Sequence, residues 1–286
     1  MFEGLKKDND ILRAAADIFC EMKANKPLVE CLTNRVTIND CANMLLAMGA
    51  SPIMAEAECE MEDIMRISSS LVLNLGLLGD KHQAAMKTAA RAARSMGKPI
   101  ILDPVGAGAS AYRNEVCADM IECAGPTVIR GNMSEIKSLC GARIESKGVD
   151  ASGDDTVNAG NYAEYGEMIR ALAKKHGCAV CATGETDVIS DGDRIYYLHN
   201  GTDMLCGVTG TGCMCSATIG ALCACGDPLA ATAAAVIMQG IAGEYAAEYV
   251  RNSGEGIGTF RAKLFDYIYL MKADDFTKRG EAYVQG

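Results

Sequence analysis

Residues 99–108 read Pro-Ile-Ile-Leu-Asp-Pro-Val-Gly-Ala-Gly, a short apolar run that ends in a carboxylate and a glycine-rich turn. The apolar residues predict a buried strand over Pro99–Asp103. Asp103 would then stand at the carboxyl end of this strand, where open α/β sheets hold their ligands. The alternative is that Asp103 only caps the following helix.

Six further apolar runs predict strands at Leu28–Leu32, Leu71–Leu75, Thr127–Arg130, Cys178–Thr183, Asp187–Ser190 and Arg194–Leu198. Helical patterns lie at Thr37–Met48, Lys81–Met96, Glu135–Cys140, Tyr162–His176, Gly212–Cys225, Leu229–Arg251 and Gly258–Met271. Alternating short strands and helices predict an α/β fold in which a mostly parallel central sheet is flanked by helices on both faces. A glycine-bearing turn, Asp191-Gly-Asp193, predicts one antiparallel hairpin, so the sheet should be mixed.

The chain has 286 residues, 49% hydrophobic and 22% charged, which is ordinary globular usage. No internal repeat or linker divides it, and residues 141–161 read as a long loop within the fold. We therefore expect a single domain over residues 1–286.

Charge and cysteine usage restrict the partners and the compartment. A net charge of −10 disfavours nucleic acid as a partner. The 14 cysteines lie mainly in apolar runs, which fits free thiols in a reducing cytosol. The start of the chain has no signal-peptide pattern, and Gly226-Asp-Pro228 interrupts the most apolar stretch. We expect a cytoplasmic protein without a membrane partner.

Familiar catalytic motifs are absent from the sequence, including a P-loop, a Gly-x-Gly-x-x-Gly fingerprint and a His-Glu-x-x-His helix. Cys178 and Cys181 form a Cys-x-x-Cys pair, but positions i and i+3 of a strand point to opposite faces and cannot share a metal. We expect both to pack in the core. The three histidines have no partners at zinc-ligand spacing.

A second strand end carries Arg130 and, at the start of the next predicted helix, Glu135. Arg130 suits a phosphate, whereas Glu135 could simply favour the helix dipole. Together, Asp103 and Glu135 would offer two hard oxygens from neighbouring strand ends. Such a pair suits Mg²⁺ completed by water and substrate phosphates.

The most informative run is residues 208–215, Val-Thr-Gly-Thr-Gly-Cys-Met-Cys. Glycines directly before a helix leave backbone N–H groups free to bind an anion, so Gly210 and Gly212 predict an anion site that could hold the charge of a transferring phosphoryl group. Gly212 is the candidate cofactor-binding residue of this turn. We expect the helix dipole to favour the thiolate of Cys213, which makes this thiol a candidate catalytic group. The alternative is close helix packing beside a buried thiol.

Seven stretches, in order, resemble the hydroxyethylthiazole kinases of thiamine salvage, a family of ribokinase-like kinases. They are residues 27–37 (PLVECLTNRVT), 49–54 (GASPIM), 73–76 (LNLG), 103–108 (DPVGAG), 130–135 (RGNMSE), 182–185 (ATGE) and 209–213 (TGTGC). The resemblance covers roughly residues 27 to 260. Glu30 and Arg35 stand where this family more often has a histidine and an aromatic residue.

The resemblance implies roles for individual positions. Substrate contacts would come from Met54 and Gly210, with Asn34 close by. It implies that Arg130 and Thr183 bind ATP, that Asp103 and Glu135 organise Mg²⁺, and that Cys213 lies beside the reacting hydroxyl. Asn34, Met54 and Thr183 are identified by resemblance alone; otherwise they would be interpreted as a turn residue, a core residue and a cap.

The implied activity is ATP-dependent phosphorylation of the hydroxyl of 5-(2-hydroxyethyl)-4-methylthiazole by a homotrimer. The nearest alternative is a ribokinase-like kinase for another small alcohol, such as hydroxymethylpyrimidine. Two others are an ATP-using lyase on the same fold and a non-catalytic protein that binds thiazoles.

Overall fold

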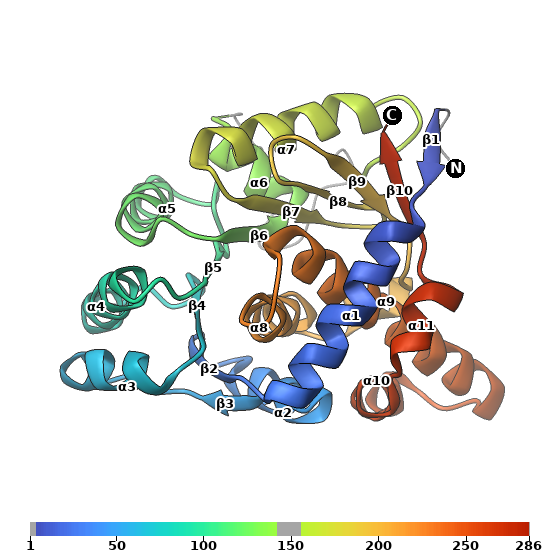
Figure 1. Cartoon of the computed structure of the whole chain (residues 1–286), viewed down its shortest axis with the longest axis horizontal. Coiled ribbons are helices and arrows are strands. Elements are labelled where there is room, and N and C mark those ends of the chain that lie inside the picture. Colours follow the sequence, from blue (N-terminus) through green and yellow to red (C-terminus); the bar gives the residue numbers. More distant parts are fainter. Residues whose placement is uncertain (1–3, 142–155, 286) are drawn as a thin grey trace.

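The computed structural model describes residues 4–141 and 156–285, and within them one mixed sheet runs through the molecule (Figure 1). Its strands are β1 (Leu5–Lys7), β2 (Leu28–Leu32), β3 (Ser51–Ile53), β4 (Ser70–Asn74), β5 (Ile100–Asp103), β6 (Val128–Asn132), β7 (Ala179–Thr183), β8 (Asp187–Ser190), β9 (Ile195–Leu198) and β10 (Ala282–Gln285). The order across the sheet is β1-β10-β9-β8-β7-β6-β5-β4-β2-β3.

Strands β3, β2, β4, β5, β6 and β7 pair in parallel, and the remaining pairings are antiparallel. The predicted hairpin is present as β8 and β9. The parallel strands bring their carboxyl ends to one edge of the sheet, which is the edge where the candidate site residues lie. The mixed, mostly parallel part of the prediction is therefore confirmed.

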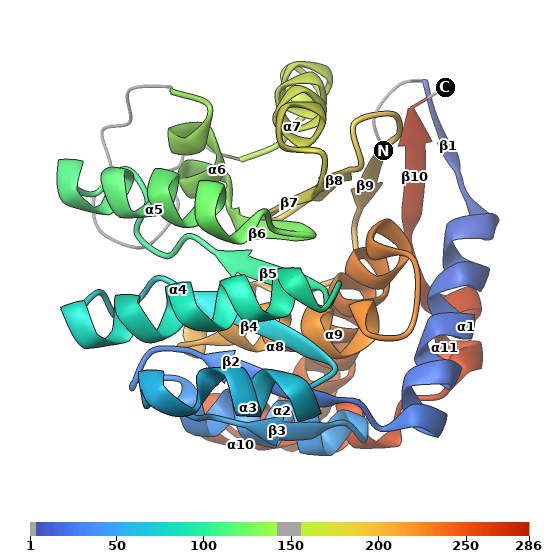
Figure 2. The ribbon, with the colours of Figure 1, turned by 60° about the vertical axis from the view of Figure 1, so that its left-hand side comes forward.

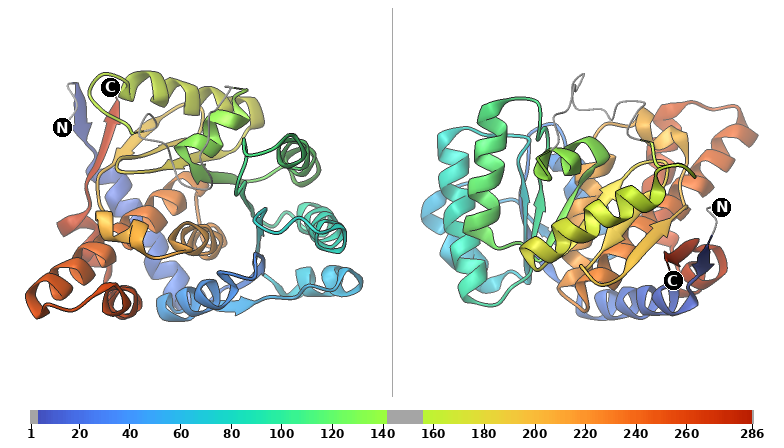
Figure 3. Two further views of the ribbon diagram at one scale, coloured as in Figure 1. Left: turned by 180° about the vertical axis from the view of Figure 1, so that it is seen from behind. Right: turned by 90° about the horizontal axis from the view of Figure 1, so that it is seen from above.

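Helices cover both faces of the sheet (Figures 1 and 2). They are α1 (Asn9–Asn25), α2 (Ile38–Met48), α3 (Met61–Ile67), α4 (Asp80–Ser95), α5 (Ala111–Ala124), α6 (Met133–Leu139), α7 (Tyr162–His176), α8 (Thr211–Cys223), α9 (Pro228–Ser253), α10 (Ile257–Leu270) and α11 (Ala273–Arg279). Helices α8 and α9 pack on one face, and α4, α6 and α7 pack on the other. Figure 3 shows the same layers from behind and from above.

Alternating strand residues build two separate cores. In β2, Cys31 belongs to the core beneath α8 and α9, whereas Leu32 belongs to the core beneath α4. The Cys-x-x-Cys pair divides in the same way, because Cys178 and Cys181 are buried in different cores. The period of two in side-chain direction explains why this pair cannot form one metal site. All 14 cysteines are free thiols.

Helix α8 lies against the sheet because Gly220 has no side chain. A Cβ atom at Gly220 would come within 2.6 Å of Val72 Cγ2 on β4. Helix α9 packs next to α8 and is long and apolar enough to cross a membrane by length and composition. However, 89% of its apolar window is buried within the protein, as expected of a core helix.

Every predicted strand and helix is present in the described part of the chain, with bounds shifted by at most a few residues. Most of the predicted loop at residues 141–161 lies outside the described residues. The prediction missed α1, α3, α5 and α11 and the short strands β1, β3 and β10. Strands β1 and β10 pair the two ends of the chain (Figure 2), a contact that no local pattern reveals.

Candidate active site

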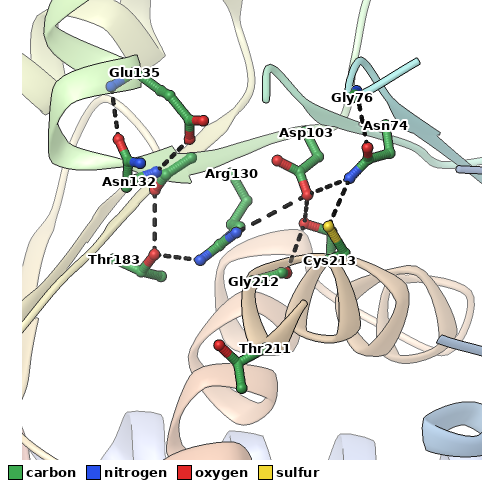
Figure 4. Close-up of polar contacts among 12 residues, drawn as sticks. Asn74, Gly76, Asp103, Arg130, Asn132, Glu135, Thr183, Thr211, Gly212 and Cys213 are labelled. Atoms are coloured by element: carbon green, nitrogen blue, oxygen red, sulfur yellow. Dashed lines mark hydrogen bonds and ion pairs between the residues drawn. The ribbon is translucent and has the colours of Figure 1, made fainter. Parts of the chain in front are cut away.

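The carboxyl ends of β4 to β7 meet the N-terminus of α8, and polar side chains fill the space between them (Figure 4). Asn74 ends β4, Asp103 ends β5, and Thr183 ends β7. Arg130 lies on β6, between β5 and β7 in the sheet. The parallel arrangement therefore brings together groups that are distant in sequence.

Asp103 is at the centre of this cluster and is 1% exposed. Its Oδ2 atom accepts hydrogen bonds from Asn74 Nδ2 and Ser216 Oγ, both at 2.9 Å. Arg130 Nη1 lies 3.9 Å from the same oxygen. Burial raises the pKa of Asp103, while Arg130, Ser216 and Asn74 act in the opposite direction. The Oδ1 atom is buried without a hydrogen-bond partner.

Arg130 crosses the start of α8, where only a glycine leaves room for it. A Cβ atom at Gly212 would lie 2.5 Å from Arg130 Nη1. Arg130 Nη2 donates to Thr183 Oγ1, and its Nε is buried without a partner. Although burial acts to lower the pKa of Arg130, the Asp103 carboxylate raises it above its ordinary value. A fixed positive charge therefore lies between the β7 end and α8.

Glu135 joins two loops at the same edge of the sheet. Its Oε1 accepts from the backbone N–H of Gly106 at 2.8 Å, and its Oε2 from that of Asn132 at 2.8 Å. Asn132 Oδ1 in turn accepts from the Glu135 backbone N–H, which completes a capping box for α6. Burial and then the charge of Asp103 raise the pKa of Glu135 to about 7. Glu135 therefore caps α6, and its pKa depends in part on the negative charge of Asp103.

The N-terminus of α8 is shaped by Gly210, the N-cap, which has a φ of 85°. A left-handed backbone suits glycine, and a Cβ here would lie 2.5 Å from Thr37 Cγ2. Cys213, in the first turn, accepts from Asn74 Nδ2 at 3.2 Å and from Asn34 Nδ2 at 3.4 Å. The predicted substrate residue Asn34 and the predicted catalytic thiol are therefore in contact.

The position of Cys213 at the start of α8, expected to favour its thiolate, does not lower the pKa of this group. Burial, and then the negative charge of Asp103, raise the pKa of Cys213 above its ordinary value. The sequence could not reveal this, because Asp103 is 110 residues away along the chain and contributes its charge only in the folded protein.

Of the predicted site residues, Met54 makes no polar contact with this network, Gly210 borders it as the N-cap of α8, and Glu135 bonds to the adjoining Gly106 and Asn132 loops. Met54 follows β3 and packs, partly buried, against the core beneath α8 and α9. Sequence reasoning missed Asn74 and Ser216, both of which donate to Asp103. Asn74 could have been found, because it lies near the end of the strand predicted over Leu71–Leu75, which precedes the strand of Asp103. Ser216 lies one helical turn after Gly212.

The model of the Hydroxyethylthiazole kinase family matches residues 19–274. The hydroxyethylthiazole kinase of Clostridium beijerinckii is 45% identical over 262 residues, which cover 91% of this chain and 93% of that protein. The solved structure of a hydroxyethylthiazole kinase from Pyrococcus horikoshii has a TM-score of 0.84 at 34% identity, covering 94% of this chain and 98% of that one.

More distant structures share the fold alone. A pyridoxal kinase from Staphylococcus aureus, solved with AMP-PCP and pyridoxal, has a TM-score of 0.54 at 17% identity and covers 74% of this chain and 85% of its own. The fold is thus ribokinase-like. With a family match over most of its length and relatives well above 30% identity, this chain belongs to the hydroxyethylthiazole kinase family.

Proposed function

We propose that this protein transfers the γ-phosphoryl group of ATP to the hydroxyl of 5-(2-hydroxyethyl)-4-methylthiazole in thiamine salvage. The single observation that carries the proposal is the cluster of Asp103, Arg130 and Cys213 at the start of α8. It combines an acid, a fixed cation and a helix N-terminus at one edge of the sheet. Phosphoryl transfer mainly requires such positioning and charge neutralisation.

The acidic residues of the cluster fit a divalent cation. Asp103 Oδ1 is a buried oxygen without a partner, and a second carboxylate, Glu135, is close enough to have its pKa raised by Asp103. Mg²⁺ prefers carboxylate oxygens together with substrate phosphates. When bound, it would neutralise phosphate charge; Asp103 would hold it directly, and Glu135 would keep the Gly106 loop in place beside it.

The positive groups fit the phosphates of ATP. Arg130 on β6 donates to Thr183 at the end of β7, and the backbone N–H of Gly212 lies in the first turn of α8. These donors are fixed before the substrate binds, so little reorganisation accompanies charge movement. We assign Arg130, Thr183 and Gly212 to the nucleotide.

The acceptor alcohol would lie on the other side of Asp103. Asn34 and Gly210 border Cys213, and Met54 provides an apolar surface suited to a thiazole ring. Since the pKa of Cys213 is raised, we assign this thiol to orienting the hydroxyl rather than to strong proton abstraction.

The test is product analysis by mass spectrometry after incubation with Mg²⁺-ATP and either hydroxyethylthiazole, hydroxymethylpyrimidine or no acceptor. The proposal predicts phosphorylated thiazole and an equal amount of ADP. Phosphorylated pyrimidine alone would contradict the substrate assignment. ATP consumption without a phosphorylated alcohol would favour a lyase, and binding without turnover would favour a non-catalytic protein.

We also propose a cytoplasmic, single-domain protein that assembles as a homotrimer. Helices α2 and α10 pack together and leave large apolar side chains exposed, with Leu46 57% and Tyr269 69% exposed, which supports an association surface. Light scattering after size-exclusion chromatography should give three times the 30.2 kDa mass of the chain. A monomer mass at assay concentrations would contradict the trimer.

A further inference from the structure

Asn74 lies between the two groups that the proposed mechanism brings closest to the acceptor. It is the last residue of β4, is 1% exposed, and stands beside Asp103 in the sheet register (Figure 4). Its Nδ2 donates to Asp103 Oδ2 at 2.9 Å and to Cys213 Sγ at 3.2 Å. One amide nitrogen therefore joins the carboxylate to the thiol.

The orientation of this amide is fixed by its other end. Asn74 Oδ1 accepts from the backbone N–H of Gly76 at 3.0 Å and from Asn34 Nδ2 at 3.1 Å. An amide turned the other way would place its carbonyl oxygen against the Asp103 carboxylate and its N–H₂ group against a backbone donor. Both hydrogens of Nδ2 must therefore face Asp103 and Cys213.

We propose that Asn74 is a positioning residue for phosphoryl transfer, holding the Asp103 carboxylate and the Cys213 sulfur in one fixed relation. By donating to Oδ2, it fixes the orientation of a carboxylate whose other oxygen, Oδ1, has no protein donor. By donating to Sγ, it fixes the side chain beside the acceptor hydroxyl. The inference rests on the kinase function proposed above.

A purely structural role is the competing explanation, since Asn74 also secures the turn at Gly76. Asn74→Asp separates the two roles because aspartate keeps the oxygen that accepts from Gly76 and Asn34. It replaces only the donor: a carboxyl group has at most one hydrogen to donate, so the hydrogen bonds to Asp103 and Cys213 cannot both form. Asn74→Ala removes both roles.

Asn200→Ala is the matched control. Asn200 is also a buried asparagine with several contacts, donating to Glu244 Oε1 and to the Arg279 carbonyl at 2.9 Å and accepting from the Glu281 N–H at 2.7 Å. It lies outside the cluster at α8. Thermal unfolding of all variants would show how much stability each substitution removes.

We expect kcat for thiazole phosphorylation to fall about 100-fold in Asn74→Asp and at least about 10-fold in Asn74→Ala, with KM for ATP changed less than about threefold. In a Cys213→Ala background, the further loss caused by Asn74→Ala should shrink several-fold, because the two residues act through one contact. Asn200→Ala should keep wild-type kcat.

Two results would overturn the inference: near wild-type kcat in folded Asn74→Asp, or an Asn74→Ala effect that is the same with and without Cys213. If Asn74→Asp does not fold, the inference is decided by comparing the effect of Asn74→Ala on kcat in the wild-type and Cys213→Ala backgrounds. Failure of the proposed function is distinguishable, because the wild-type protein itself would then yield no phosphorylated thiazole.

Discussion

The missing side chain at Gly212 is what allows Arg130 to lie across the start of α8. Because a Cβ would lie 2.5 Å from Arg130 Nη1, Gly212→Ala should displace the guanidinium from its place beside Thr183 and Asp103. We predict that kcat/KM for ATP falls about 10- to 100-fold while the fold is retained.

Gly258→Ala provides the control for this substitution. Gly258 is a helical glycine in α10 with nothing within 4 Å of its potential Cβ. Removing glycine from a helix should leave activity unchanged and stabilise the protein by about 0.5–1 kcal/mol. Equal kinetics in the two variants would show that Arg130 does not depend on Gly212.

A substitution at Cys213 tests whether this side chain acts mainly by positioning the acceptor hydroxyl or by removing its proton. Its pKa is raised, and its sulfur is held by two amides. Cys213→Ser keeps an acceptor for those amides, so we predict measurable activity, within about 100-fold of wild type. A folded serine variant with activity at background level would identify the thiol as indispensable to the chemistry.

Strand β2 carries a carboxyl group, Glu30, in its buried middle, at 0% exposure. Its Oε2 accepts from the Ala55 N–H at 3.4 Å, next to Met54, and its Oε1 has no partner. Burial raises the pKa of Glu30 to about 8; the Ala55 N–H lowers it, and Glu60 raises it further. The folded protein therefore holds Glu30 protonated at neutral pH.

This raised pKa makes stability depend on pH. Unfolded Glu30 would ionise near pH 4.5, so its contribution is fully present below that pH and declines by up to about 1.4 kcal/mol per unit until pH 8. We predict that Glu30→Gln stabilises the protein progressively between pH 5 and 8. Urea unfolding at several pH values would check this, with exposed Glu255→Gln as control, and a pH-independent difference would contradict it.

The strands and helices that were predicted, and those that were missed, show which features of the fold a local sequence pattern reveals. Strand β2 and helix α7 were predicted to the residue, because apolar runs and helical spacing are local signals. Helix α1 was missed although Leu12, Phe19 and Met22 lie on one buried face and Asp8 caps it. Helix α5 was missed as well, although Val116, Cys117, Met120, Ile121 and Ala124 also line one buried face.

Across the whole molecule, the sequence predicted the residue types of the site better than their electrostatics. Asp103, Arg130 and the turn before Cys213 were identified from strand ends and glycine spacing, and the structure brings them together. The roles of Asn74 and Ser216 depend on contacts between β4, β5 and α8. Such contacts, and the pKa shifts that burial causes, exist only after folding.

The central claim is that the cluster around Asp103 is a phosphoryl-transfer site. Asp103→Asn tests it most directly, since asparagine preserves the shape and can accept from Asn74 and Ser216 while removing the charge. The measurement is kcat for formation of phosphorylated hydroxyethylthiazole, quantified by mass spectrometry on protein shown to be folded. We predict a loss of about 100- to 10,000-fold; activity within tenfold of wild type would contradict the account.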